Sequence, residues 1–214
     1  MNIGLIIVQL IAFAFALSFH EMAHAWAADR LGDPTARLQG RLSMNPIVHI
    51  DPMMTVLFPA LLIFAGSPVV FGAAKPVPVN TMNLEHPKQD HMWIAAAGPI
   101  SNFIQAAATI VLLRLMGVPL LVAAQTGSSW AMPVFSLLQQ LLVVNLVLGI
   151  FNLIPLYPLD GSWILSRFLT GSAAMAYASL RPYGFLILIL LLWVGALDVL
   201  LGPVLAIANM LLTI

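Results

Sequence analysis

The 214-residue sequence has no cysteine and very few charged residues, which make up only 7% of the chain. Soluble domains carry about 25% charged residues, so this scarcity, with 61% hydrophobic residues and a mean hydropathy of +1.01, predicts a polytopic protein of the lipid bilayer. The absence of cysteine excludes disulfides and thiolate ligands, so a metal could be bound only through His, Asp or Glu. Because no basic stripe is present, we expect no nucleic-acid partner.

The first apolar segment also lacks a basic region, since no Lys or Arg precedes Arg30. A cleaved signal peptide needs such a region, so we expect the segment to be retained. We predict an all-α fold with about four transmembrane helices. The predicted domain is a single integral-membrane unit, residues 1–214, and its expected spans are residues 3–28, 92–116, 133–152 and 182–201.

The connection between the first two spans, residues 29–91, is the most polar part of the chain. Apolar and polar residues alternate over residues 37–42, which indicates a short strand. Residues 53–65 are apolar but too short to cross a bilayer comfortably, so we expect a re-entrant or interfacial piece there.

Prolines in residues 71–79 exclude a helix, so this segment should be extended. We therefore expect a short re-entrant and extended β segment on the cytoplasmic side. Its exposed edge, at Lys75, Pro76 and Val77, could bind an extended substrate peptide by strand addition. A plain structural hairpin is an equally good interpretation of the same residues.

One polar cluster, His20-Glu21-Met22-Ala23-His24, interrupts the first apolar segment. On a helix His20 and His24 lie one turn apart and can bind one metal ion, while Glu21, about 100° further round, is close enough to hold a water on that metal. The alternative is two histidines satisfied by packing. Three ionisable groups in an apolar segment are costly in lipid, which favours a metal site. Zinc suits two imidazoles, one carboxylate and an open position.

A zinc site needs a third protein ligand, and we prefer Asp160. The turn over residues 152–161 places this carboxylate at the depth of the histidines, where an unpaired charge is costly. The alternative is that Asp160 caps the next helix. The other candidates are Asp29, Asp33, Asp51, Glu85, Asp90, Asp198, His49, His86 and His91, and we assign these last three histidines no role.

Charge asymmetry predicts the topology. Seven of the eight basic residues fall in residues 29–91 and 163–181, and the positive-inside rule places both connections in the cytoplasm. We therefore expect a multi-pass protein of the cell (inner) membrane with both termini outside. The histidines and Asp160 then lie near the cytoplasmic face.

The second span contains Gly98-Pro99-Ile100-Ser101-Asn102. Its small residues permit close helix packing, and Asn102 is a buried amide that needs a partner. From the residues alone, an interhelical hydrogen bond is the preferred interpretation.

Two motifs on separate spans, His-Glu-x-x-His and Asn-Leu-Ile-Pro-Leu-Tyr-Pro-Leu-Asp-Gly, resemble the site-2 protease family of intramembrane zinc metalloproteases. The Gly-Asp-Pro-Thr turn, Asn45-Pro46, Ala-Lys-Pro-Val-Pro and Gly-Pro-x-x-Asn look like that family too. The resemblance covers roughly residues 15–165. The sequence departs from many members at residues 161–163, and it resembles a compact form because no PDZ-like or CBS-like insert is present.

The resemblance implies that one zinc ion per chain is bound by His20, His24 and Asp160, and that Glu21 activates the water. It implies that Asn152 binds the substrate or the oxyanion, and it extends substrate binding more weakly to Asn102. The implied substrates are membrane proteins cleaved in or near their transmembrane segments. The sequence does not predict an oligomeric state.

Two other functions fit parts of the sequence. A membrane metal-ion transporter could use the His/Glu/Asp cluster as a transit site, but no inverted repeat or pair of broken helices is evident. A catalytically silent scaffold would have no need of an intact His, Glu and Asp set.

Overall fold

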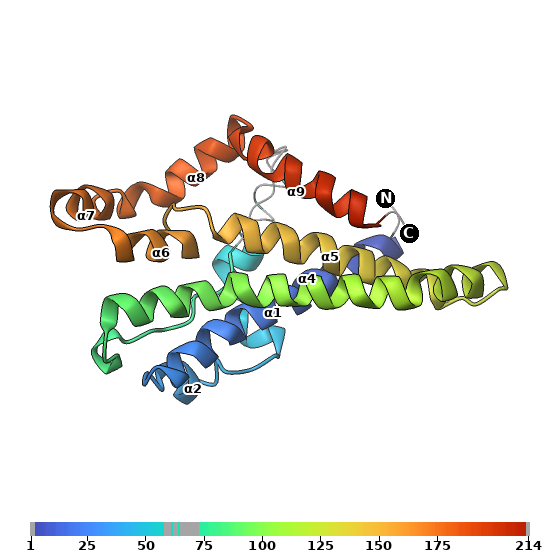
Figure 1. Cartoon of the computed structure of the whole chain (residues 1–214), viewed down its shortest axis with the longest axis horizontal. Coiled ribbons are helices and arrows are strands. Elements are labelled where there is room, and N and C mark those ends of the chain that lie inside the picture. The colour runs from blue at the N-terminus through green and yellow to red at the C-terminus, as the bar shows by residue number, and fades with distance from the viewer. Residues whose placement is uncertain (1–2, 58–60, 62–63, 65–72, 213–214) are drawn as a thin grey trace.

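The computed structural model describes residues 3–57, 61, 64 and 73–212, and these are mostly helical (Figure 1). The helices in chain order are α1 (Ile3–Arg30), α2 (Thr35–Leu38), η1 (Pro46–His49), η2 (Pro52–Leu57), η3 (Thr81–Asn83), α4 (Pro87–Gln125), α5 (Ala131–Asn152), α6 (Asp160–Phe168), α7 (Gly171–Ala178), η4 (Arg181–Tyr183), α8 (Gly184–Trp193) and α9 (Ala196–Leu212).

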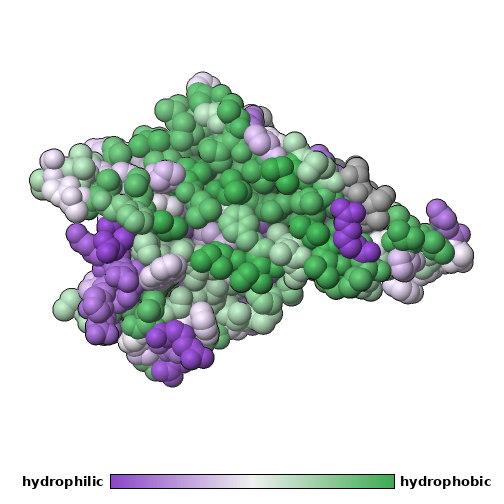
Figure 2. Space-filling view, in the orientation of Figure 1, coloured by the Kyte–Doolittle hydropathy of each residue, from purple (hydrophilic) through white to green (hydrophobic). Residues whose placement is uncertain are grey.

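Within the described residues, four helical segments are long and apolar enough to cross a membrane: α1, α4, α5 and the stretch Gly171–Trp193. Large hydrophobic side chains are exposed along them, as expected for helices that face lipid. Figure 2 shows hydrophobic residues over most of the visible face and hydrophilic ones gathered near α2 and the start of α4. The chain is therefore an all-α, multi-pass membrane protein, as predicted.

Helices α1, α4 and α5 pack against one another, and α6 packs on α4 while α9 packs on α5. The largest hydrophobic core lies between α4 and α5 and includes Leu113, Leu120, Phe135 and Leu142. Small buried residues on α1, such as Ala12 and Ala16, allow close approach of the neighbouring helices. This packing brings residues of α1, α4 and α6 together.

Residues 182–201, the expected last span, do not form one continuous helix. Helix α8 ends at Trp193, and Gly195 has φ of +71°, a left-handed conformation that L side chains rarely adopt. The chain turns there and continues as α9, so the two helices meet at an angle in Figure 1. An apolar stretch identifies membrane-embedded residues but does not reveal such a break.

The expected β segment is wrong, because the described part of the chain contains no strand. Residues 37–42 begin instead within α2, a helix of four residues. Residues 73–80 are non-helical, as their prolines predicted, but they form no sheet ladder. Of the expected re-entrant piece, residues 53–57 belong to the π-helical η2, while most of residues 58–65, like residues 71 and 72, lies outside the described residues.

Asp33 fastens the turn after α1 to the segment that precedes α4. Its fully buried carboxylate accepts hydrogen bonds from the amide and hydroxyl of Thr35, from the Asn80 amide at 2.7 Å and from Asn83 Nδ2 at 2.7 Å. Burial by itself raises the pKa of Asp33, but these hydrogen bonds outweigh it and hold the pKa below its ordinary value. The ionised carboxylate is therefore the form that stabilises this connection.

We expect Asp33→Asn to destabilise the protein by about 1–3 kcal/mol, because the amide cannot satisfy the same donors. The stabilisation by ionised Asp33 is complete above its unfolded pKa of about 3.9 and is lost as the pH falls through the lower folded pKa. Thermal unfolding in detergent as a function of pH measures both effects. Asp29→Asn, which removes only a pair with the half-exposed Arg37, is the control and should cost at most about 1 kcal/mol.

Candidate metal centre and active site

Helix α1 presents the two histidines on one face. The sequence keeps α1 helical through this region, so His20 and His24, four residues apart, are both buried with Nε2 atoms 3.1 Å from each other. Gly98 of α4 lies directly against them, because a Cβ at this position would overlap His24 Nε2 and His20 Cε1. The absence of a side chain at Gly98 therefore lets α4 cover the imidazoles.

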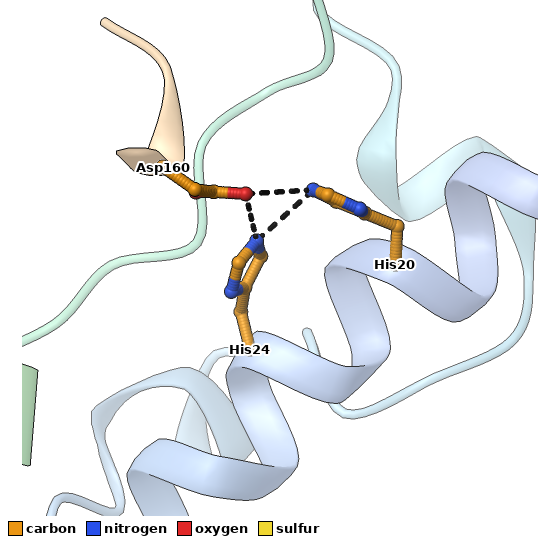
Figure 3. A group of neighbouring side chains, drawn as sticks. All are labelled: His20, His24 and Asp160. Atoms are coloured by element: carbon orange, nitrogen blue, oxygen red, sulfur yellow. Dashed lines mark hydrogen bonds and ion pairs between the residues drawn. The ribbon is translucent and has the colours of Figure 1, made fainter. Parts of the chain in front are cut away.

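Asp160 brings a carboxylate to the same point from the other side. It is the first residue of α6, and its Oδ2 lies 3.2 Å from His20 Nε2 and 3.3 Å from His24 Nε2. Figure 3 shows the three side chains directed toward one another. A Cβ on the next residue, Gly161, would overlap backbone atoms of Leu153. Glycine therefore permits the close approach of α6 to the end of α5, on which the position of Asp160 depends.

The outer nitrogens of the histidines determine which tautomers are present. His20 Nδ1 lies 2.6 Å from Asn102 Oδ1, and His24 Nδ1 lies 2.7 Å from the carbonyl oxygen of Ile94. Both partners accept hydrogen bonds, so each neutral imidazole carries its proton on Nδ1. Both Nε2 atoms therefore direct lone pairs at the point that Asp160 approaches, an orientation typical of metal-binding histidines.

Asn145 of α5 fixes the orientation of the Asn102 amide. Its Nδ2 donates to the Leu141 carbonyl at 2.9 Å, so its Oδ1 faces Asn102 and accepts from Asn102 Nδ2 at 2.8 Å. Asn102 must then turn its own Oδ1 to His20. A chain of hydrogen bonds, with both amides fully buried, thus runs from α5 through α4 to the imidazole on α1.

These three atoms fit a zinc ion. His20, His24 and Asp160 form a group of possible metal ligands, and Asp160 Oδ2 is a buried oxygen with no hydrogen-bond partner. Ligand atoms about 2.0 Å from a tetrahedral zinc are ~3.3 Å apart, close to the observed 3.1–3.3 Å. Three electron-pair donors this close in a buried site repel one another, and a cation between them would relieve that repulsion.

The N-cap residue of α6 is Leu159, and Asp160 is the first residue of the helix rather than its cap. Glu21 is also buried, next to His20 on α1. The hydrogen bonds and ion pairs found among the described residues do not include its carboxylate.

The remaining predicted site residues do not belong to this group of possible metal ligands. Asn102 makes the expected interhelical hydrogen bond and contacts His20. Asn152 ends α5, where one N–H of its Nδ2 donates to the Leu148 carbonyl at 3.0 Å, which leaves the second N–H for another acceptor. Lys75 and Pro76 are exposed and Val77 is half-buried in the non-helical segment before α4.

Sequence reasoning missed Asn145 as a residue connected to the site. Its signal was a single amide in the otherwise apolar residues 141–151, where an unpaired polar group is costly. The partner comes from another helix, however, so the sequence does not identify it.

Asn145→Leu should weaken zinc binding by about 10-fold, because it removes the acceptor that orients Asn102 and hence the His20 tautomer. Competition with a chromophoric chelator measures the zinc affinity without requiring catalysis. Thr109→Val is the matched control, since Thr109 is a buried residue of α4 whose hydroxyl bonds only to the Gln105 carbonyl of its own helix. Equal zinc affinity of Asn145→Leu and the control would contradict the role given to this hydrogen-bond chain.

The fold and the site together define a class: a multi-pass membrane protein with a buried group of possible metal ligands between its helices. The model of peptidase family M50 matches residues 8–194. "Putative zinc metalloprotease YwhC" of Bacillus subtilis is 38% identical over 185 residues, covering 85% of this chain and 78% of that protein. "Putative zinc metalloprotease Rip2" of Mycolicibacterium smegmatis is 29% identical over 196 residues, covering 92% and 70%.

The chain belongs to peptidase family M50. This membership agrees with the resemblance to the site-2 proteases seen in its motifs. Neither the family match nor the relatives favour the metal-ion transporter. No solved structure matches the chain.

Proposed function

We propose that His20, His24 and Asp160 bind one zinc ion per chain, that Glu21 is the catalytic base, and that residues 1–214 form one membrane domain around this site. The enzyme is an intramembrane zinc metalloprotease of family M50. The observation that carries the residue assignment is the convergence of two Nε2 lone pairs and the unpartnered Asp160 Oδ2 in a buried site.

The chemistry divides between the metal and the chain. Bound zinc lowers the pKa of a water molecule toward neutrality and polarises the scissile carbonyl. Glu21 accepts the proton of the attacking water and later delivers it to the leaving amine, first as general base and then as general acid. The free N–H of Asn152 Nδ2 donates to the oxyanion as negative charge develops there. Asn102 acts through His20 and keeps its Nε2 directed at the metal.

The substrates we propose are transmembrane proteins, cleaved in or near a membrane-spanning helix. A buried site between apolar helices is reached most directly by a segment that is itself in the membrane. Such a helix must unwind locally, because its carbonyls are otherwise occupied by hydrogen bonds. The non-helical residues 73–80 offer backbone groups to the unwound strand.

We also propose that the site lies near the cytoplasmic face, with both termini outside. The basic connections at residues 29–91 and 163–181 support this orientation. In Figure 1 the N-terminal end of α1 and the C-terminal end of α9 lie to the right of centre, whereas α2, α6 and α7 lie on the left. Cysteine labelling from either side tests the orientation, since the chain has no cysteine of its own.

A panel of single-span membrane proteins incubated with purified enzyme in detergent tests the proteolytic function, with products mapped by mass spectrometry. We expect cleavage in or near the spanning segment of at least one substrate. Zinc flux into liposomes, measured on the same preparation, tests the transporter. Zinc flux without cleavage would contradict the proposed function.

A further inference from the structure

A buried cation, Arg41, lies outside the apolar helices and is unused by the mechanism above. It is 4% exposed, and no carboxylate of the described residues forms an ion pair with it. Its guanidinium instead donates to two consecutive carbonyls, those of Lys75 and, at 3.2 Å, of Pro76. Burying a charge is expensive unless it is hydrogen-bonded. These two carbonyls are therefore the main groups that stabilise the buried guanidinium of Arg41.

His49 contacts both Arg41 and Lys75. It is 1% exposed, and its Nε2 donates to the Ser43 carbonyl at 2.8 Å, so Nδ1 is bare and faces an Arg41 nitrogen 3.4 Å away. The backbone carbonyl of His49 also accepts from the Lys75 amide at 2.8 Å. Arg41 and His49 together therefore occupy both backbone groups of Lys75. Asp33 holds the far end of the same segment through the Asn80 amide.

These contacts determine which backbone N–H and C=O groups of residues 75–80 remain without a hydrogen-bond partner inside the described part of the protein. Pro76 and Pro78 have no N–H, and the amides of Val77 and Val79 have no partner among the described residues. In extended backbone, residues two apart present their N–H and C=O to the same edge. The Val79 side chain also packs near Ala27 and Ala28 of α1, the helix that carries the histidines.

We propose that Arg41 is a positioning residue, which with His49 holds Lys75 and Pro76 so that the Val77 and Val79 backbone is presented to an unwound substrate strand. This proposal rests on the proteolytic function proposed above. It differs from the sequence expectation at Lys75 and Pro76, because their carbonyls are held by the enzyme and only the Val77 part of that edge remains for substrate.

Hydrogen exchange without substrate tests the contact itself. In Arg41→Gln the Lys75 amide should exchange about 10-fold faster or more than in the wild type. Arg37→Gln is the matched control, because Arg37 lies nearby on α2 but is exposed and pairs only with Asp29. Unchanged Lys75 exchange in a folded Arg41→Gln protein would overturn the proposal.

Cleavage kinetics on a single-span substrate test the consequence. Arg41→Gln should raise KM about 10-fold with zinc content and kcat little changed, Arg41→Lys should recover part of this loss, and Arg37→Gln should behave like the wild type. Val77→Pro, which removes one presented N–H and leaves Arg41 intact, should also raise KM without altering zinc content. It serves as the test if Arg41→Gln does not fold.

The outcomes separate the two proposals. If the wild-type enzyme cleaves its substrate and both Arg41→Gln and Val77→Pro have the wild-type KM, only the positioning role of Arg41 is overturned. A zinc-loaded wild-type protein that cleaves no membrane substrate would overturn the proposed function, and the positioning of substrate with it.

Discussion

Glu21→Gln should abolish proteolysis while leaving zinc in place. The amide has nearly the same size as the carboxylate but cannot accept the proton of the attacking water, so the rate should fall by about 10²- to 10⁴-fold. Zinc should remain bound, because the proposed ligands are His20, His24 and Asp160. Cleavage of a single-span substrate and zinc per chain, measured on the same purified samples, give both quantities.

Glu85→Gln is the control for this experiment, since Glu85 is an exposed carboxylate in the connection before α4. It should cleave like the wild type. If the Glu21→Gln variant cleaves at the wild-type rate, Glu21 is not the base. If that variant loses zinc, Glu21 has a role in metal binding instead.

Asp160→Asn should release zinc from the folded protein. The substitution keeps the shape of the side chain but replaces the anionic oxygen that converges with the two Nε2 atoms by a weaker, neutral donor. The fall in zinc affinity should exceed the roughly 10- to 100-fold typical of residues that only orient a ligand. Competition with a chelator measures it, with a thermal unfolding curve to show that the variant is folded.

Asp198→Asn is the matched control, because Asp198 is exposed in the first turn of α9 and distant in sequence from the other candidates. It should retain one zinc per chain. A folded Asp160→Asn protein with wild-type zinc affinity would show that another group supplies the third ligand.

The candidate site follows from the sequence where local geometry determines it. The spacing of His20 and His24 on one helix predicts their shared face whatever surrounds them. Asp160 could be preferred because a lone carboxylate at membrane depth is costly without a partner. Its approach to the histidines, however, depends on Gly98 and Gly161, whose backbones come too close to other helices for a side chain.

The hydrogen-bond chain behind the site could not be predicted in the same way. Asn145 and Asn102 are 43 residues apart, and nothing in either local sequence shows that α4 and α5 meet there. The sequence identifies Arg41 only as one of the basic residues between the first two spans. Counting the charges of a connection does not show whether a guanidinium is buried or solvated.

The sequence predicts the helices that depend only on the length of an apolar stretch. The predictions that depend on local backbone conformation were wrong. The number of long apolar helices follows from composition. The alternation over residues 37–42 suggested a strand, but Asp33 bonds to Thr35 at the start of α2 and stabilises a helical turn there. The turn at Gly195 depends on one residue in an apolar stretch that otherwise continues.

The most direct test of the account is cleavage of a single-span membrane substrate by the purified wild-type protein before and after removal of its metal. We expect about one zinc per chain, loss of cleavage when a chelator removes it, and recovery when about one equivalent of zinc is returned. Undiminished cleavage by metal-free protein, or a folded wild-type protein that binds no zinc, would contradict the central claim.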